Sequence, residues 1–204
     1  MKNNYDTIAR YYDFLSRTIF QRSIINAQVY LLSHIKPNTT VLIVGGGTGW
    51  ILEKFQPSGL EITYVEISES MLTLSKKRVQ YNNVQFVHQS IEEFTSSRQY
   101  DIILTPFLFD NFSATNAAVI FEKLHTCLKT GGDWLFADFV DDPKQLWQQI
   151  MLKTMYIFFK VFARIEAGKL NDMDGLFSRY QYQKIDERFY YGRFICAAVY
   201  RKEL

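Results

Sequence analysis

Three glycines at alternate positions, Gly45, Gly47 and Gly49, follow an apolar run, TTVLIVGG, and indicate a ligand-binding turn. Glycine lets the backbone turn sharply and lets a ligand approach without meeting a Cβ atom. The same spacing also occurs in tight turns that bind nothing, so the glycines alone do not define a site. A chemical partner for the loop must come from elsewhere in the chain.

Glu66, seventeen residues after Gly49, supplies such a partner at the end of the next apolar run, ITYVEI. A carboxylate only accepts hydrogen bonds, and its two oxygens can receive both hydroxyls of a ribose. A glycine turn followed by an acid at this distance therefore fits any adenosine-containing cofactor. Dinucleotide oxidoreductases and S-adenosylmethionine enzymes are the two alternatives at this point.

The residues after the glycines distinguish these cofactors. The dinucleotide fingerprint GxGxxG requires a third glycine, so that a helix end can approach the pyrophosphate. That position is Trp50 when counted from Gly45 and Leu52 when counted from Gly47. Both side chains are bulky, which favours a ligand without phosphates, such as S-adenosylmethionine.

The elements that position these residues are predicted from hydrophobic patterns. The run at 39–46 is continuous and β-branched, which indicates a strand buried on both faces. Ser68 is predicted to cap a helix over 69–79. Apolar residues at three- and four-residue steps predict another helix over 117–128, ended by Gly131 and Gly132. Further strands are predicted at 62–67, 84–88, 100–105, 134–139 and 194–201.

Alternating strands and helices from 41 to about 166 predict an α/β fold: a doubly wound, mostly parallel, seven-stranded sheet with helices on both faces. After a helix over about 142–166, segments 178–189 and 193–201 are predicted to form a C-terminal antiparallel hairpin around Gly192. We expect one domain, 1–204, with a helical cap at 1–35 and an α/β core at 36–204.

Composition restricts the partners and the compartment. With 23 basic and 21 acidic residues, the net charge of +2 leaves no surplus for a phosphate backbone, so nucleic acid is not expected. No apolar stretch is long enough to span a bilayer, and the N-terminus does not resemble a secretory signal, so a cytoplasmic location is expected. Cys127 and Cys196 have no metal-binding spacing, and we expect reduced core cysteines and no metal.

Five segments resemble, in order and spacing, the motifs of class I S-adenosylmethionine-dependent methyltransferases over roughly residues 5–140. VLIVGGGTG is similar to the first motif, EISESML to the second and VQFVHQSIEEF to the third. YDIILTPFLFDNF resembles the fourth, and LKTGGDWLFADF the family's LKPGG element. The opening YDTIARYYDF resembles a helix that many small-molecule members fold over the cofactor, with Tyr12 or Tyr5 reaching its methionine end.

The resemblance implies S-adenosylmethionine as the cofactor and a set of residues that bind it. Ser90 replaces an acid that usually binds the adenine amino group, and the Ile91 N–H can serve adenine N1. Ile43 stands where the first motif usually has an acid that steadies the glycine loop. The implied cofactor-binding residues are Tyr12, Gly45, Gly46, Gly47, Gly49, Glu66, Ile67, Met71, Ser90, Ile91 and Thr105.

Methyl transfer from a sulfonium mainly requires alignment and a dry pocket. For a hydroxyl acceptor, the candidate general bases are Asp110 and Asp138 at strand ends, although the first could instead cap a helix and the second anchor a loop. The fourth motif reads TPFLFD rather than NPPY or DPPY, which disfavours N-methylation of DNA. The aromatic segment 153–170 is either a helix packed on the sheet or a wall over an apolar acceptor, such as a lipid, quinone or aromatic metabolite.

The leading hypothesis is an enzyme that methylates an apolar or aromatic small molecule. A second class remains open, a binding or regulatory module on the same fold, which the replacements at Ile43 and Ser90 would fit. A nicotinamide enzyme and an aminopropyl transferase are further alternatives. The latter would need acids to hold a polyamine, and the TPFLFD loop offers only Asp110.

Overall fold

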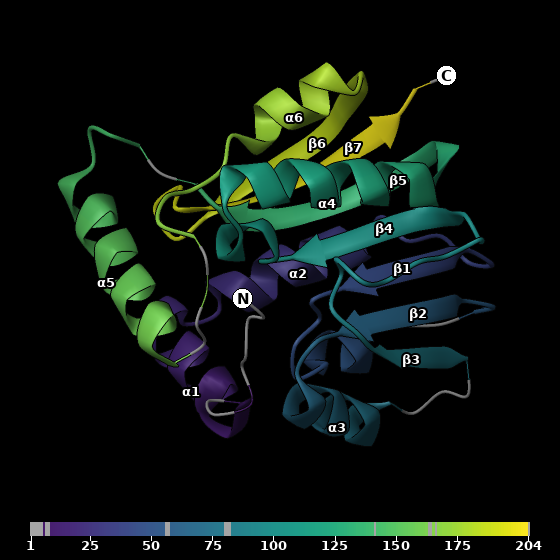
Figure 1. Cartoon of the computed structure of the whole chain (residues 1–204), viewed down its shortest axis with the longest axis horizontal. Helices are drawn as coiled ribbons and strands as arrows, with labels where there is room; N and C mark the ends of the chain where they lie inside the picture. The colour runs from purple at the N-terminus through teal and green to yellow at the C-terminus, as the bar shows by residue number, and fades with distance from the viewer. Residues whose placement is uncertain are drawn as a thin grey trace.

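A seven-stranded sheet in the order β3-β2-β1-β4-β5-β7-β6 forms the centre of the computed structural model, which describes residues 6, 9–55, 58–79, 83–140, 142–162, 165 and 167–203 (Figure 1). The first five strands run parallel, and β7 is antiparallel to both β5 and β6. This confirms the predicted doubly wound sheet with a C-terminal hairpin. The strands are β1 Thr40–Val44, β2 Glu61–Glu66, β3 Val84–His88, β4 Tyr100–Pro106, β5 Leu128–Phe139, β6 Tyr182–Tyr190 and β7 Ile195–Lys202.

Helices cover both faces of this sheet, because successive side chains of a buried strand point to opposite faces. On one face, Ile43 of β1 packs in a cluster with Leu31 of α2 and Met155 of α5. On the other face, Leu42 packs with Phe121 of α4. The helices are α1 Ala9–Phe20, α2 Ser23–Leu32, α3 Glu69–Arg78, α4 Ala114–Cys127, α5 Leu146–Phe162 and α6 Met173–Arg179, with short 3-10 turns η1 Trp50–Lys54 and η2 Phe109–Asn111.

Two serine caps account for the helix starts nearest the glycine loop. The Ser68 hydroxyl accepts a hydrogen bond from Met71 N at 3.1 Å, which confirms the predicted start of α3. Ser113 caps α4 in the same way, and this helix begins three residues before the predicted Ala117.

Five segments differ from the sequence expectation. The first crossover, η1, is a 3-10 turn rather than an α-helix, because Gly49 precedes it in a left-handed conformation and the sequence reaches Pro57 soon after. No helix joins β3 to β4 in the described residues between them, where turns follow β3.

α4 ends at Cys127, four residues before Gly131, and both predicted stop glycines instead lie within β5, where its register with β4 shifts. At the C-terminus, the Asp172 side chain caps α6, so 178–181 complete a helix and a turn and the strand begins only at Tyr182. The predicted helix over 142–166 is shorter, and its described part is Leu146–Phe162.

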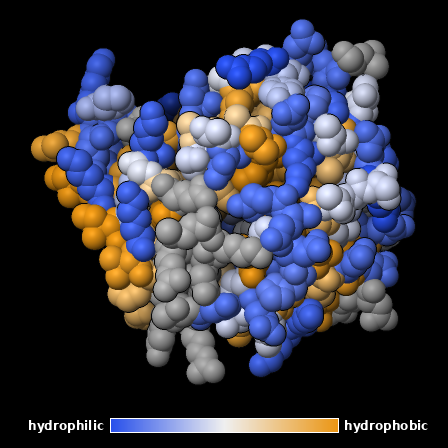
Figure 2. All heavy atoms as spheres, viewed as in Figure 1, coloured by the Kyte–Doolittle hydropathy of each residue, from blue (hydrophilic) through white to orange (hydrophobic). Residues whose placement is uncertain are grey.

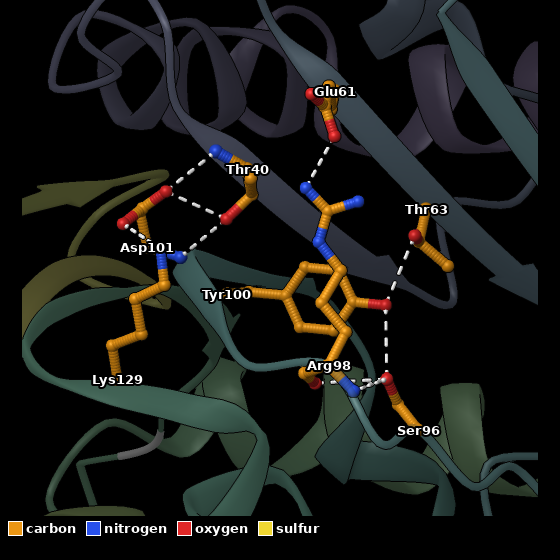
Figure 3. Close-up of polar contacts among 8 residues, drawn as sticks. All are labelled: Thr40, Glu61, Thr63, Ser96, Arg98, Tyr100, Asp101 and Lys129. Atoms are coloured by element: carbon orange, nitrogen blue, oxygen red, sulfur yellow. Dashed lines mark hydrogen bonds and ion pairs between the residues drawn. The ribbon is translucent and has the colours of Figure 1, made fainter.

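The amino ends of the central strands are joined by a polar network (Figure 3). The Asp101 carboxylate accepts hydrogen bonds from Thr40 N at 2.9 Å, Thr40 Oγ1 at 2.7 Å and Lys129 Nζ at 2.6 Å. Burial opposes ionisation of Asp101, but these hydrogen bonds outweigh it and hold the pKa below its usual range. Beside this cluster, Arg98 pairs with Glu61. The network joins the amino ends of β1, β4 and β5 and lies at the edge of the sheet opposite the glycine loop.

Within the described part of the chain, no helix is long and apolar enough to cross a membrane. The same residues contain no cluster of His, Cys, Asp and Glu that could hold a metal ion. Cys127 and Cys196 are both buried free thiols.

Candidate active site

A cavity of about 110 Å³ opens where the carboxyl ends of β1, β2 and β4 meet. Open parallel sheets bind ligands at this edge. Seven residues of the predicted cofactor set line the cavity: Gly45, Gly46, Gly47, Glu66, Ile67, Met71 and Ile91. The sequence therefore located the glycine loop and the acid on a single cavity.

The glycine loop depends on backbone freedom and on close packing beneath it. Gly45 and Gly47 have φ of +69° and +61°, a region that other residues rarely adopt. Gly46 has no such φ, but a Cβ atom there would lie 2.4 Å from the hydroxyl of Tyr64. That hydroxyl donates a hydrogen bond of 2.9 Å to the Gly47 carbonyl. The fully buried Tyr64 thus supports the loop from the neighbouring strand.

Glu66 is the buried acid of the cavity, with 4% of its surface exposed. Its Oε2 accepts a hydrogen bond from Gly47 N at 3.0 Å, and its Oε1 accepts one from Ser68 N at 2.8 Å. Burial raises the pKa of Glu66, while these N–H donors oppose the rise. Since a carboxylate oxygen has two lone pairs, each oxygen can accept a further hydrogen bond from a ligand.

Asp13 joins α1 to the glycine loop and was missed in the sequence. Its Oδ1 accepts from the Thr48 hydroxyl at 2.7 Å, and its Oδ2 pairs with Arg78 of α3 at 2.7 Å. Asp13 also lines the cavity. The sequence signal was its place in YYDF, the segment predicted to fold over the cofactor, although the prediction named the tyrosines. The Tyr12 side chain and all of Tyr5 lie outside the described residues.

Three residues of the predicted cofactor set are not among those that line the cavity. Gly49 packs against α3, where a Cβ would lie 2.4 Å from that of Ser75. Ser90 is buried and accepts a hydrogen bond from Glu93 N at 3.3 Å, which closes a turn. Thr105 points to the opposite face of β4 and accepts from Trp134 Nε1 at 2.9 Å. Gln89, next to Ser90, and Pro106, next to Thr105, line the cavity instead.

Ile43, the residue that replaces an acid of the family motif, lies in the apolar core rather than at the cavity. It is fully buried and pairs in register with Tyr64 of β2. An acid here would be surrounded by apolar side chains, whereas isoleucine packs without a desolvation cost. The support of the loop comes from Tyr64 instead.

A second cavity of about 180 Å³ lies beside the first, between α1 and α5. The two cavities share Ser16, Ile24, Phe107 and Asn111 as lining residues, so they are direct neighbours. The rest of the second wall is mainly aromatic and aliphatic: Ile19, Phe20, Phe139, Met151, Met155, Phe158 and Phe159, with Thr154 and Asp110 as the polar members.

The two candidate bases form a carboxyl pair with different roles. Buried Asp138 accepts hydrogen bonds from Phe109 N at 3.0 Å, Asp110 N at 3.2 Å and Phe139 N at 2.8 Å, and so anchors η2. Burial raises the pKa of Asp138 to about 7. Burial and the charge of Asp138 together raise the pKa of Asp110 well above its usual range.

Three N–H donors favour the ionised form of Asp138 and so oppose the rise in its pKa. Asp110 lies on the wall of the second cavity, and Asn111 Nδ2 donates to its Oδ1 at 2.7 Å. Asp110 does not cap α4, since Ser113 does. Of the two predicted bases, geometry leaves Asp110 available to a ligand.

Comparison with known proteins identifies the class. Residues 41–132 match the methyltransferase domain family. Over 145 residues the chain is 30% identical to malonyl-[acyl-carrier protein] O-methyltransferase of Priestia megaterium, covering 68% of this chain and 51% of that protein. Over 154 residues it is 29% identical to ubiquinone/menaquinone biosynthesis C-methyltransferase UbiE of Ectopseudomonas mendocina, covering 70% and 57%. The matches therefore span about half the length of these relatives.

The fold has a solved counterpart with a bound ligand. N-methyltransferase NodS from Bradyrhizobium japonicum WM9, in complex with S-adenosyl-l-homocysteine, aligns with a TM-score of 0.69 at 12% identity, covering 90% of this chain and 87% of that one. The sheet order and the glycine-loop cavity define the Rossmann-like architecture of class I methyltransferases. The chain belongs to the methyltransferase domain family.

Proposed function

We propose that the chain transfers a methyl group from S-adenosylmethionine, bound in the glycine-loop cavity, to an apolar, ring-bearing small molecule in the second cavity. The observation that carries this proposal is the shared wall of Ser16, Ile24, Phe107 and Asn111. Ligands in two cavities that share a wall are held close and in fixed orientation, which is the main requirement for an in-line displacement.

The polar groups of the first cavity match those of the cofactor. Glu66 has acceptor capacity left on both oxygens for the ribose hydroxyls, and Ile67 and Met71 line the same cavity as apolar neighbours. The Asp13 carboxylate, on the same wall, is suited to an ammonium group such as that of the methionine end. When bound, S-adenosylmethionine supplies the methyl group as an electrophile on a positively charged sulfur.

The lining of the second cavity supports an apolar acceptor. Five phenylalanines contribute to it: Phe20, Phe107, Phe139, Phe158 and Phe159. Such a wall excludes water and offers edge and face contacts to a ring. The relatives from Priestia megaterium and Ectopseudomonas mendocina are named for an acyl carrier protein and for quinones, and the aromatic wall favours the ring-bearing class for this chain.

Asp110 supplies the proton acceptor in this proposal. Asn111 donates to Oδ1 of Asp110, which leaves Oδ2 as the atom that takes the proton of an acceptor hydroxyl or of an acidic carbon. A raised pKa makes this carboxylate a stronger base than an ordinary aspartate. Activity is then lost as pH falls through the raised pKa, because Asp110 becomes protonated.

The test incubates the full chain with methyl-labelled S-adenosylmethionine and a panel of alkylated hydroquinones, phenols and polar amines, and follows the label by mass spectrometry. Labelled ring products are expected. Met155→Trp, which fills the second cavity, should abolish transfer and leave binding of S-adenosylhomocysteine unchanged. Transfer to polar amines only would refute the apolar acceptor, and cofactor binding without transfer to any compound would favour the alternative of a binding module.

Asp110→Asn distinguishes a role of Asp110 as general base from its role in lining the second cavity. The amide keeps the shape of the side chain and the hydrogen bond from Asn111, so substrate binding should be retained. We expect transfer to fall by about 10²-fold or more and its acid-side pH dependence to disappear, as for a lost general base. An unchanged pH profile in this variant would show that Asp110 does not take the proton.

A further inference from the structure

The solvent-facing side of α5 is apolar, although a helix on a protein surface normally exposes polar residues there. Leu146, Ile150, Ile157 and Val161 are 74%, 57%, 68% and 67% exposed. Their spacings of four, seven and four residues place them on one stripe of the helix, which we call the outer stripe. Figure 2 shows hydrophobic side chains gathered along the edge of the molecule that α5 forms in Figure 1.

The outer stripe is separate from the face that α5 turns to the protein. Leu152 and Met155 are buried in the core cluster, and Met155 lines the second cavity. α5 therefore has two apolar faces, one for the core and one exposed. Packing against the described part of the chain explains only the inner face.

Charge beside the outer stripe indicates what covers it. Lys153 follows Ile150 by three residues and precedes Ile157 by four, and Lys160 follows Ile157 by three, so both exposed lysines border the stripe on one side. The sequence of α5 contains no acidic residue. A second copy of the chain would bring the same lysines together. An anionic lipid surface offers hydrocarbon for the stripe and negative headgroups for the lysines.

We propose that the outer stripe of α5 docks the protein on anionic lipid bilayers, with the helix lying in the plane of the membrane interface. The long lysine side chains extend from the buried stripe to the headgroups. The second cavity lies on the other side of the same helix, so docking brings it next to the bilayer. Delivery of an apolar acceptor from the membrane follows only if the proposed function holds. The docking itself does not depend on it.

Co-sedimentation of the full chain with vesicles tests this interface. Vesicles of mixed phosphatidylglycerol and phosphatidylcholine should bind the protein, and pure phosphatidylcholine should bind it far less. Ile157→Glu and, separately, Val161→Glu should each weaken binding by about tenfold or more, the effect of losing one buried aliphatic side chain. Lys153→Gln with Lys160→Gln should weaken it by about fivefold per lysine and reduce its salt dependence.

Val119→Glu on α4 is the matched control, since Val119 is an aliphatic residue 59% exposed on a different helix. It should bind vesicles like the unsubstituted chain. Absence of vesicle binding, or equal binding by Ile157→Glu, would overturn the proposal. A dimer in lipid-free solution that Ile157→Glu dissociates would assign the stripe to a second copy instead. Calorimetry with S-adenosylhomocysteine on the same variants shows whether the cofactor cavity is intact, which keeps this outcome distinct from a failure of the proposed function.

Discussion

Replacing Gly46 with alanine places a methyl group against the ring of Tyr64, and this tests the packing beneath the glycine loop. The new Cβ would lie 2.4 Å from the Tyr64 hydroxyl and 2.5 Å from two ring carbons. Tyr64 is fully buried, so the ring cannot swing into solvent. Because Gly46 does not have a positive φ, the substitution adds a clash without adding backbone strain.

The expected cost follows from two contributions. Overpacking of a buried site costs about 1–3 kcal/mol. Loss of the hydrogen bond from Tyr64 to the Gly47 carbonyl adds about 1 kcal/mol. Gly46→Ala should therefore destabilise the fold by about 2–4 kcal/mol. Gly131→Ala is the matched control, since Gly131 has no atom near its Cβ position and should cost only about 1 kcal/mol from its positive φ.

A double-mutant cycle measured by urea denaturation distinguishes this clash from other effects. In a Tyr64→Leu background the ring atoms are absent, and Gly46→Ala should then cost less than about 1 kcal/mol. Gly46→Ala should also weaken S-adenosylhomocysteine binding, because the clash displaces the loop that lines the cavity. Additive costs in the cycle would refute the reasoning, because the two residues would then not contact each other in the folded protein.

Three further predictions concern Asp110, Asp13 and the two cysteines. Burial and a neighbouring carboxylate raise the pKa of Asp110, so the folded protein loses stability as pH rises from the ordinary aspartate range through that raised pKa. Asp110→Asn should remove this part of the pH dependence, measured by urea denaturation at each pH, and an unchanged dependence would show that another group causes it. Asp13→Ala removes the hydrogen bond from Thr48 and should speed amide hydrogen exchange in α1, whereas unchanged exchange would show that α1 is held elsewhere. Burial raises the pKa of Cys127, and that of Cys196 to about 12, so neither should react with a thiol reagent at pH 8 before unfolding.

Much of the fold could be predicted because local patterns determine it. The continuous apolar run of β1 requires cover on both faces, and this alone indicates a parallel sheet between two helical layers. The cap at Ser68 is equally local. Glu66 was placed correctly beside the glycine loop because the carboxyl ends of neighbouring parallel strands meet at one edge.

The differences between the predicted cofactor set and the residues that line the cavity have physical reasons. Side chains of a strand alternate between faces, so Pro106 lines the cavity whereas the side chain of the neighbouring Thr105 bonds Trp134. In the loop after β3, Gln89 lines the cavity and the neighbouring Ser90 does not. Asp13 acts through partners 35 and 65 residues away, Thr48 and Arg78, and no local pattern reports such pairs.

The replaced acid at Ile43 shows how a neighbouring strand changes the meaning of a motif. From the sequence it indicated a weakened loop. The structure pairs Ile43 with Tyr64, whose hydroxyl supports the Gly47 carbonyl, and the absence of a side chain at Gly46 gives the ring its space. The three positions form one packing unit, so the isoleucine is not by itself a sign of lost binding.

Calorimetric titration of the chain with S-adenosylhomocysteine tests the central claim most directly. We predict one binding site per chain, with affinity weakened about tenfold or more by Glu66→Gln, because an amide cannot accept both the Gly47 and Ser68 N–H groups and bind ribose as a carboxylate does. Asp110→Asn should leave this affinity unchanged. No binding at millimolar ligand, or equal affinity in Glu66→Gln, would contradict the assignment of the glycine-loop cavity to the cofactor.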